Sequence, residues 1–417
     1  MCMKQLTDIS SDLSFYLTLG FLFLIPFSIA ACYILFTLLL LQLSFFSVNI
    51  LKNRNHPPLP GVPGATFPTL PGYYKYFLLF ILATFISTLF AIDISLSLND
   101  NREFFIYLLI PLLLLVLNSR KRLLYSALVV LASALVSSLW GIVQSVINGI
   151  NLDHRLQGAT SHWMTYAGLL MFPFIFFFVY AFYEKRKKIK MLLTLSLAII
   201  LIPILLSLTR SVWVGIFIAL GIFIIYYKPK ILVLVIPVFL CLLLLLPGSV
   251  KSRLTSIFDM NNDTNKDRLY MVQIAVKIFK DYPLTGVGPN GIEKVYHLYK
   301  PAAAEQTNTH LHNNFLQILA ERGIFALIML LLAFGSVILL LIQKMRPHKK
   351  PAQEEKAVAT AVLFVFIGFL IAGLFEYNFG DSEVKFLLFY FLSIPFLPVF
   401  ADASDAADSP SPKIEGV

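Results

Sequence analysis

Long apolar segments separated by short polar ones dominate the chain. A helix that crosses a membrane needs about 20 mostly apolar residues. Stretches of that kind recur along the sequence at 14–51, 73–92, 102–118, 123–148, 163–183, 190–209, 211–227, 231–247, 314–343, 357–376 and 383–400. The first is long enough for two helices with a break near Pro26 and Ser28. The pattern therefore predicts an all-α polytopic membrane protein with about twelve transmembrane helices.

Polar segments divide this pattern into four parts. We expect transmembrane helices with short loops in 1–247, one large loop with short helices in 248–313, the last three transmembrane helices in 314–400, and a disordered polar tail in 401–417. The Pro- and Gly-rich residues 53–72 suit an extended connector. Within the large loop, residues 266–280 carry a polar stripe on an otherwise apolar surface. This predicts a helix lying on the membrane surface or against the bundle.

Composition agrees with a chain surrounded mostly by lipid. Hydrophobic residues make up 58% of the chain and charged residues 13%, whereas soluble domains have roughly 45–50% and about 25%. The cysteines Cys2, Cys32 and Cys241 are scattered along the sequence. They suggest neither a disulfide framework nor a metal cluster.

Loops rich in lysine and arginine alternate along the chain with loops that contain few basic residues, and this alternation predicts the orientation of the chain. One set of alternate loops holds Lys52, Arg54, Lys75, Arg120, Lys121, Arg122, Lys185, Arg186, Lys187, Lys188, Lys190, Lys228, Lys230, Lys344, Arg346, Lys349, Lys350 and Lys356. The opposite short loops hold only Arg102, Arg155, Arg210 and Lys385. The positive-inside rule makes the first set and both termini cytoplasmic. The net charge of +10 then reflects orientation and contact with anionic lipids, not nucleic-acid binding.

Polar residues from segments far apart in sequence fall on the predicted outer side. They are Arg155, His162, Arg210, Arg268, His310, His312, Glu376, Asp381 and Glu383. An arginine at the centre of a membrane helix costs roughly 2.5–3.5 kcal/mol on insertion scales. Arg210 lies between apolar residues in LLSLTRSVWVG. It is either a snorkelling arginine at a helix end or a ligand for an anion such as phosphate.

His310 and His312 precede a long apolar run in THLHNNFLQILAERGIFAL. A His-x-His pair can bind zinc, but a complete site needs three or four ligands, and no cysteine or further histidine accompanies the pair. We therefore expect no metal. A helix-capping imidazole and a general base near neutral pH remain as interpretations.

Two further patterns resemble known motifs only superficially. GVGPNG at 286–291 lacks the strand and helix of a dinucleotide-binding unit, so its glycines are expected to form tight turns. The alternating acidic and amide residues of 259–267 begin like a calcium loop. Thr264 replaces the required glycine and Tyr270 the final glutamate, so an EF-hand is not expected.

Four segments together resemble the O-antigen ligase and polymerase (WaaL/Wzy-like) superfamily. They are RLQGATSHWMTYAG at 155–168, SLTRSVWVG at 207–215, DRLYMVQIAVKIFKDYPLTGVGPNG at 267–291 and HNNFLQILAERG at 312–323. The resemblance extends over roughly residues 100 to 385, and it rests on the order and spacing of the motifs around the large loop.

The resemblance implies a GT-C-type glycosyltransferase in the bacterial inner membrane, with its active site on the periplasmic side and no cofactor. The donor would be a glycan on undecaprenyl pyrophosphate. By motif position, Arg210 and Arg268 would bind the pyrophosphate, and His312 would position or deprotonate the acceptor hydroxyl. His310 would orient its neighbour, with Arg155 and His162 as further contributors at the donor pocket. Direct displacement at the anomeric carbon would invert its configuration.

The acceptor is less strongly indicated than the donor. The large loop and the HLHNN segment favour a ligase that uses lipid A–core as acceptor. A polymerase that extends another carrier-linked glycan, and an enzyme that glycosylates proteins, are alternatives in the same superfamily. From other classes, a lipid-linked glycan transporter and a structural scaffold also fit a polytopic chain. A transporter would carry charge through mid-membrane, whereas the helix centres here are nearly free of it.

Overall fold

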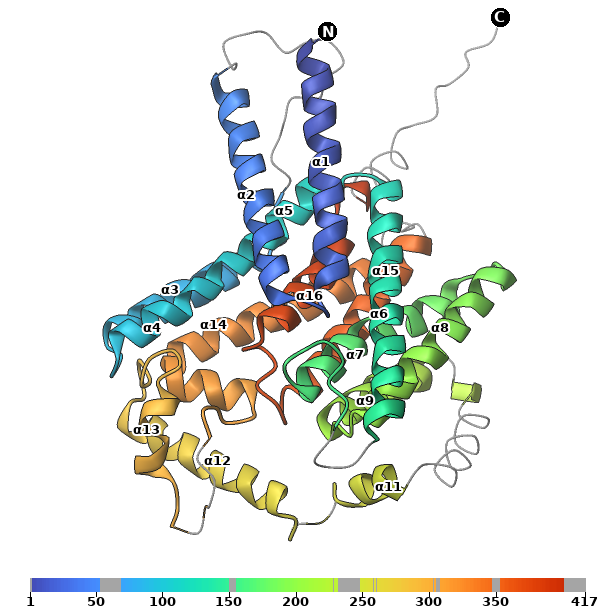
Figure 1. Cartoon of the computed structure of the whole chain (residues 1–417). Coiled ribbons are helices and arrows are strands. Elements are labelled where there is room, and N and C mark those ends of the chain that lie inside the picture. Colours follow the sequence, from blue (N-terminus) through green and yellow to red (C-terminus); the bar gives the residue numbers. More distant parts are fainter. Residues whose placement is uncertain are drawn as a thin grey trace, which may run out of the picture.

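The computed structural model describes residues 2–52, 69–149, 155–227, 229–231, 248–257, 259, 261–302, 304, 308–346 and 353–400. The regular structure of these residues is helical (Figure 1). Most of the predicted connector 53–72, the predicted helix 231–247 and the predicted disordered tail 401–417 lie outside the described residues.

The helices follow one another along the chain. They are α1 (Cys2–Leu24), α2 (Ile29–Lys52), α3 (Tyr74–Leu89), α4 (Ile94–Asp100), α5 (Leu109–Val116), α6 (Arg120–Asn148), α7 (Trp163–Tyr183), α8 (Lys187–Leu206), α9 (Arg210–Tyr227), α11 (Gly248–Thr255), α12 (Asp263–Asp281), α13 (Ile292–Tyr299), α14 (Asn314–Met345), α15 (Gln353–Ala372) and α16 (Ser382–Ser393). Short 3₁₀ helices are η1 (Asn101–Leu108), η2 (Pro229–Ile231) and η3 (Ile394–Phe396).

Seven helices in the described part of the chain are long and apolar enough to cross a membrane. They are α6, α7, α8, α9, α14, α15 and the segment Ser382–Phe400 that begins with α16. The apolar parts of α1, α2 and α3 are shorter, and the predicted break between α1 and α2 lies at residues 25–28. The predicted span 102–118 is instead split between η1 and the short helix α5. The first residues of η1, Asn101, Arg102 and Glu103, are polar. The eight-residue helix α5 is too short to cross a membrane alone.

Helix α7 lies at the centre of the bundle, packed against α15, α9, α8 and α16. It is apolar on all sides because most of its side chains are buried in protein. A glycine allows α9 to approach α15 closely, since a Cβ at Gly215 would lie 2.7 Å from the carbonyl oxygen of Gly368. Small residues commonly permit such contacts between membrane helices. The contact fixes the position of α9, which begins at Arg210.

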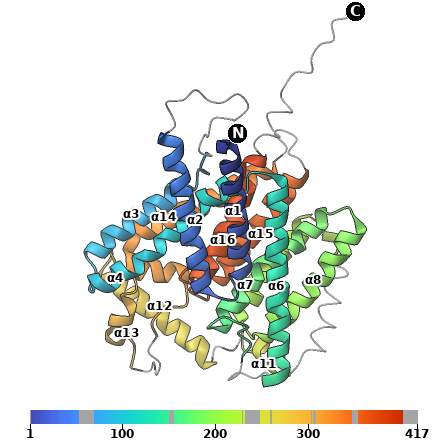
Figure 2. The same cartoon turned by 45° about the horizontal axis from the view of Figure 1, so that its top comes forward.

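Helices α11, α12 and α13 lie at the end of the bundle opposite the chain's N-terminus (Figures 1 and 2). The predicted amphipathic helix 266–280 is confirmed as α12, and it packs against α14. Its buried side chains belong to a separate hydrophobic cluster formed by Met271, Ile274, Ala275, Ile278, Val287, Ile292, Val295, Tyr296, Leu311 and Ala320. This cluster joins the segment 261–302 to the residues that precede and begin α14.

The glycines of 286–291 form turns, as predicted. Gly286 and Gly288 have φ values of 67° and 95°. The turn fits into a break in α14 at Gly323, where φ is 75° and ψ is −177°. The backbone N–H groups of Val287, Gly288 and Ile324 donate to the carbonyls of Ala320, Glu321 and Pro283, at 3.0, 2.8 and 3.0 Å. The first turns of α14 are thereby fixed to the chain that follows α12.

Candidate active site

The N-terminus of α14 is capped by Asn313. The Asn313 side-chain oxygen accepts hydrogen bonds from the backbone N–H groups of Phe315 and Leu316, at 2.9 and 3.0 Å. This satisfies two of the four free N–H groups at the helix start. The same side chain donates from Nδ2 to the carbonyl of Leu374 at 2.9 Å. His312 precedes the cap with φ 46°, a left-handed conformation that histidine adopts more readily than most residues.

Asn314 ties the segment between α15 and α16 to the start of α14. Its backbone N–H donates to the carbonyl of Gly373 at 2.8 Å. Its buried side chain donates to Asn378 Oδ1 at 2.7 Å and accepts from the backbone N–H of Phe379 at 3.0 Å. Adjacent asparagines thus hold residues 373–379 against the segment that carries the histidines. Glu376 lies in the middle of the held segment.

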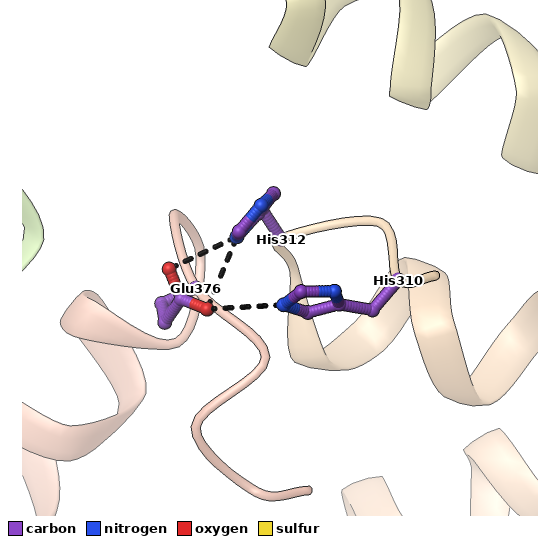
Figure 3. Close-up of side chains that lie close together, drawn as sticks. All are labelled: His310, His312 and Glu376. Atoms are coloured by element: carbon purple, nitrogen blue, oxygen red, sulfur yellow. Dashed lines mark hydrogen bonds and ion pairs between the residues drawn. The ribbon is translucent and has the colours of Figure 1, made fainter. Parts of the chain in front are cut away.

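Glu376 lies between His310 and His312 (Figure 3). His312 Nδ1 is 3.0 Å from both carboxylate oxygens of Glu376, and His310 Nε2 is 3.7 Å from Oε1. The imidazole ring centres are 4.2 Å apart. Burial disfavours the charged form of Glu376, but hydrogen bonds and charge from His310 and His312 outweigh it and lower the pKa of Glu376 to about 2. At neutral pH the three residues therefore form a carboxylate–imidazole cluster.

The carboxylate sets the tautomer of His312. An ionised carboxylate can only accept hydrogen bonds, so a neutral His312 carries its proton on Nδ1 and its lone pair on Nε2. That is the arrangement of a general base oriented by a carboxylate. The sequence placed Glu376 on the predicted outer side but gave it no partner.

Arg210 begins α9 and is 5% exposed. Its Nη1 donates to the carbonyl and hydroxyl of Ser256, at 2.8 and 3.2 Å. Within the described residues its other terminal nitrogen, Nη2, is buried without a hydrogen-bond partner. A buried, unpaired donor on a charged group is costly. An anion at this position would complete its hydrogen bonding.

Arg268 reaches the same region from α12. Its Nη2 donates to the carbonyl of Phe375 at 3.1 Å, and its guanidinium carbon lies 6.0 Å from the centre of the Phe375 ring. Burial lowers the pKa of Arg268, and Glu376 partly opposes this shift. The carbonyl contact links Arg268 to the residue immediately before Glu376.

Arg253 on α11 is a third arginine in this region, and the sequence interpretation missed it. It is 7% exposed, and its Nε donates to the carbonyl of Leu208 at 3.3 Å. Burial, followed by the nearby charges of Arg210, Arg155 and Arg268, lowers the pKa of Arg253 to about 10. All of these arginines are still cationic at neutral pH and make the region strongly electropositive. Only its place in the large loop, in KSRLTS, could have drawn attention to Arg253.

A cavity of about 300 Å³ lies between Arg210, Arg268 and His312. Its polar lining is Arg210, Ser211, Asn265, Arg268, His312 and Asn313. The remaining lining is apolar and comes from Val214, Ile257, Leu269, Val272, Leu311, Leu316, Leu374 and Phe375. Three predicted site residues, Arg210, Arg268 and His312, therefore line one cavity although they lie far apart in sequence.

Arg155 and His162 lie beside this site and do not line the cavity. His162 caps α7, since its Nδ1 accepts from the backbone N–H of Met164 at 3.2 Å. Burial lowers the pKa of His162, with a partly opposing effect of Glu376. The guanidinium of Arg155 lies 4.8 Å from the centre of the Trp163 ring. The structure thus gives His162 a capping contact that the sequence did not anticipate.

Asp381 and Glu383 follow Glu376 along the chain. The hydroxyl of Thr165 donates to Asp381 Oδ2 at 2.8 Å. Burial raises the pKa of Asp381 to about 7, and the negative charges of Glu376 and Glu383 add to the shift. Glu383 lies in the first turn of α16. Asp381 therefore lies close enough to Glu376 to be influenced by its charge.

His310, His312 and Glu376 also constitute a group that could hold a metal ion. One potential ligand atom from each residue lies within 4.8 Å of the others. The sequence argument against zinc counted the two histidines alone, whereas Glu376 supplies a third donor. Three protein ligands is the number found at catalytic zinc sites. Because the same three residues already pair with one another as carboxylate and imidazoles, the response to chelators is the direct test.

Residues 195–331 match the O-antigen ligase family (Wzy_C). The matched segment contains Arg210, Arg253 and Arg268 together with the two histidines, and it ends within α14. No curated protein shows a significant sequence match to the chain. The match covers less than half of the chain, and it supports the resemblance to the O-antigen ligase and polymerase superfamily.

Proposed function

We propose that the chain is an O-antigen ligase. In this proposal it moves a glycan from undecaprenyl pyrophosphate to a sugar hydroxyl of lipid A–core, at the periplasmic face of the bacterial inner membrane. The observation that carries the proposal is the cavity lined jointly by Arg210, Arg268 and His312. It combines anion-binding groups with a candidate base, which are the requirements for displacing a pyrophosphate with a hydroxyl.

The cavity suits an amphiphile with an anionic head. The unpaired Nη2 of Arg210 supports a phosphate ligand, because guanidinium groups bind phosphate oxygens through charge-assisted hydrogen bonds. The apolar wall formed by Ile257, Leu269, Val272 and Phe375 suits the first units of a polyprenyl chain. A donor of this class is already activated, so the reaction requires neither ATP nor a nucleotide sugar.

In the proposed step, the acceptor hydroxyl oxygen attacks the anomeric carbon of the donor glycan. The bond from that carbon to the pyrophosphate oxygen breaks, and the hydroxyl proton passes to Nε2 of His312. Glu376, hydrogen-bonded to Nδ1, stabilises the imidazolium that forms. Arg210 and Arg268 stabilise the negative charge on the departing pyrophosphate. A single displacement of this kind inverts the anomeric configuration.

The proposed location follows from the loops. The lysine- and arginine-rich loops are assigned to the cytoplasm by the positive-inside rule. Arg210, Arg268 and His312 then lie on the opposite, periplasmic side. The donor glycan and lipid A–core would meet there in the outer leaflet.

The test mixes purified protein in detergent with undecaprenyl-pyrophosphate-linked glycan and lipid A–core, without ATP or added metal. We expect glycan-extended lipid A–core, and a rate lower by about 10²–10⁴-fold in His312→Ala. His297→Ala is the matched control, because His297 is an exposed histidine on α13 outside the cavity lining.

Other products would select other functions. Longer carrier-linked glycan with unchanged lipid A–core would make the chain a polymerase, and a glycosylated protein would make it a protein glycosyltransferase. Movement of the carrier across vesicles without transfer would identify a transporter. A retained anomeric configuration in the product would contradict the single displacement.

A further inference from the structure

Three buried polar residues on α14 lie outside the cavity and are not used by the proposed reaction. Gln317 and Glu321 are each 1% exposed, and Arg322 is 6% exposed. They stand within a helix long and apolar enough to cross a membrane. Polar groups in such positions are expensive and are generally retained because they perform a function. Their contacts indicate which function.

Gln317 connects to the histidine segment. Its Oε1 accepts the backbone N–H of Leu311 at 2.7 Å, and its Nε2 donates to Glu321 Oε1 at 2.8 Å. A backbone N–H can only donate, so the Gln317 amide oxygen must face Leu311 and the amide has one possible orientation. Leu311 is the residue between His310 and His312. Its backbone is therefore anchored to the interior of α14.

Arg322 connects to the segment that carries Glu376. Its Nη1 donates to the hydroxyl of Tyr377 at 3.2 Å, and its Nη2 pairs with Asp100 Oδ2 at 3.0 Å. Tyr377 directly follows Glu376, and Asp100 ends α4. Glu321 Oε2 lies 3.8 Å from Arg322 Nη1. Glu321 thereby joins the contact at Leu311 to the contact at Tyr377.

We propose that Gln317, Glu321 and Arg322 form a positioning network that holds His312 and Glu376 in hydrogen-bonding contact. One end of the network fixes the backbone beside the histidines, and the other fixes the residue beside the carboxylate. A misplacement of about 1 Å in a reacting group can reduce a rate by about 10²-fold. The network acts through His312 and Glu376, and it rests on the function proposed above.

Two variants test the network. Each removes the hydrogen bonds at one end of it and changes the side-chain volume little. Gln317→Leu removes both amide contacts, and Tyr377→Phe removes only the hydroxyl that Arg322 binds. Each is expected to lower kcat by about tenfold or more and to leave the KM for the donor unchanged, because Arg210 and Arg268 are untouched. The double variant should be no worse than the poorer single variant, because residues that act as one unit are not additive.

A second readout does not depend on turnover. Diethylpyrocarbonate modifies accessible neutral imidazoles, and mass spectrometry locates the modified residue. In Gln317→Leu and Tyr377→Phe we expect His312 to react several-fold faster than in the unaltered protein, because its ring is no longer held by Glu376. Exposed His297 is the internal reference and should react at the same rate in every variant.

Lys344→Gln is the matched control. Lys344 is on the same helix and pairs with Glu355 of α15 at 2.7 Å, far from the histidines in sequence. It should leave kcat and His312 modification unchanged. Unchanged His312 modification in both network variants would overturn the inference, as would a loss of activity that reflects only a smaller folded fraction. If the unaltered protein transfers no glycan while His312 becomes more reactive in the variants, the proposed function fails and the positioning network stands.

Discussion

Glu376 and His312 form a carboxylate–imidazole pair, with Nδ1 at 3.0 Å from each carboxylate oxygen. Glu376→Gln should therefore lower kcat by about 10²-fold while leaving the donor KM nearly unchanged. The amide can still accept from Nδ1–H, but it carries no charge to stabilise the imidazolium. Glycan transfer by the purified variant is the measurement. Glu293→Gln, an exposed glutamate on α13, is the control, and equal kcat in the two variants would contradict a role for the carboxylate.

Arg210→Lys tests whether the fork of the guanidinium matters or only its charge. A lysine retains the positive charge but cannot bind phosphate oxygens bidentately. Loss of a hydrogen-bond donor to a developing anion typically lowers a rate by about 10²–10³-fold. We therefore expect kcat/KM for the lipid-linked glycan to decrease by about 10²–10³-fold. The thermal unfolding temperature should not fall sharply, because the change leaves no new buried cavity as large as a side chain. Arg120→Lys, in an exposed pair with Glu354, is the control. Full activity of Arg210→Lys would reduce Arg210 to a bulk electrostatic role.

The three-residue group His310, His312 and Glu376 leads to a prediction about metals. We expect transfer to be unaffected by EDTA, because the proposed base needs a free lone pair on His312. Added Zn²⁺ should inhibit, because binding to His310, His312 and Glu376 together would break the contact between His312 Nδ1 and the carboxylate. His310→Gln should weaken zinc inhibition and still transfer glycan. Loss of activity with EDTA, restored by a metal, would instead make these residues the ligands of a catalytic ion.

Hydropathy and loop charge predicted the membrane-spanning character of the chain because both depend on the distribution of residue types along the sequence and not on tertiary contacts. They also placed Arg210, Arg268 and His312 on one side of the membrane, which is a precondition for meeting in one cavity. The predicted span 102–118 is formed by the 3₁₀ helix η1 followed directly by α5. Hydropathy averages over a window, so it does not distinguish a 3₁₀ turn from an α-helical one within an apolar segment.

The pairing of His312 with Glu376 could not be predicted, because 64 residues separate the partners in sequence. It depends on hydrogen bonds from Asn313 and Asn314 to residues 373–379, and these exist only in the folded protein. Arg253 was missed for a similar reason. An arginine in a loop is ordinarily solvated, and only the packing of α11 against Leu208 reveals that this one is buried.

Asp381 makes stability depend on pH. Its pKa in the folded protein, about 7, is raised above the ordinary value of 3.8 by burial and then by the charges of Glu376 and Glu383. The folded state therefore holds the proton more tightly than the unfolded state. The contribution of protonated Asp381 to the free energy of unfolding is fully present below about pH 4 and is lost as the pH rises through about 7. Asp381→Asn, which keeps an acceptor for Thr165, should remove this dependence.

The comparison is made by thermal unfolding in detergent at pH 5 and pH 8. Relative to the unaltered protein, Asp381→Asn should unfold at a higher temperature at pH 8, by a few degrees (roughly 2–4 °C). The difference should shrink at pH 5. A difference that is the same at both pH values would show that Asp381 does not titrate in this interval.

Gly323 interrupts α14 at the point where the 283–291 turn fits against it. With φ 75° and ψ −177° it occupies a region that essentially only glycine enters, and a Cβ there would overlap the Leu284 carbonyl. Gly323→Ala should destabilise the fold by about 1–3 kcal/mol or more. Gly335→Ala on the same helix is the control, because a Cβ there would meet nothing within 4 Å. Alanine should stabilise that turn by up to about 1 kcal/mol through helix propensity.

The thermal unfolding temperatures of Gly323→Ala and Gly335→Ala distinguish two effects on stability. One is the helix propensity of alanine, and the other is the fit of the 283–291 turn against α14. Because the turn also contacts the backbone of Ala320 and Glu321, Gly323→Ala should displace the network that begins at Gln317. His312 should then become more reactive towards diethylpyrocarbonate in Gly323→Ala and remain as protected as before in Gly335→Ala. Similar unfolding temperatures for the two variants would mean that the break in α14 is not required. The turn at 283–291 would then have no part in holding the histidines.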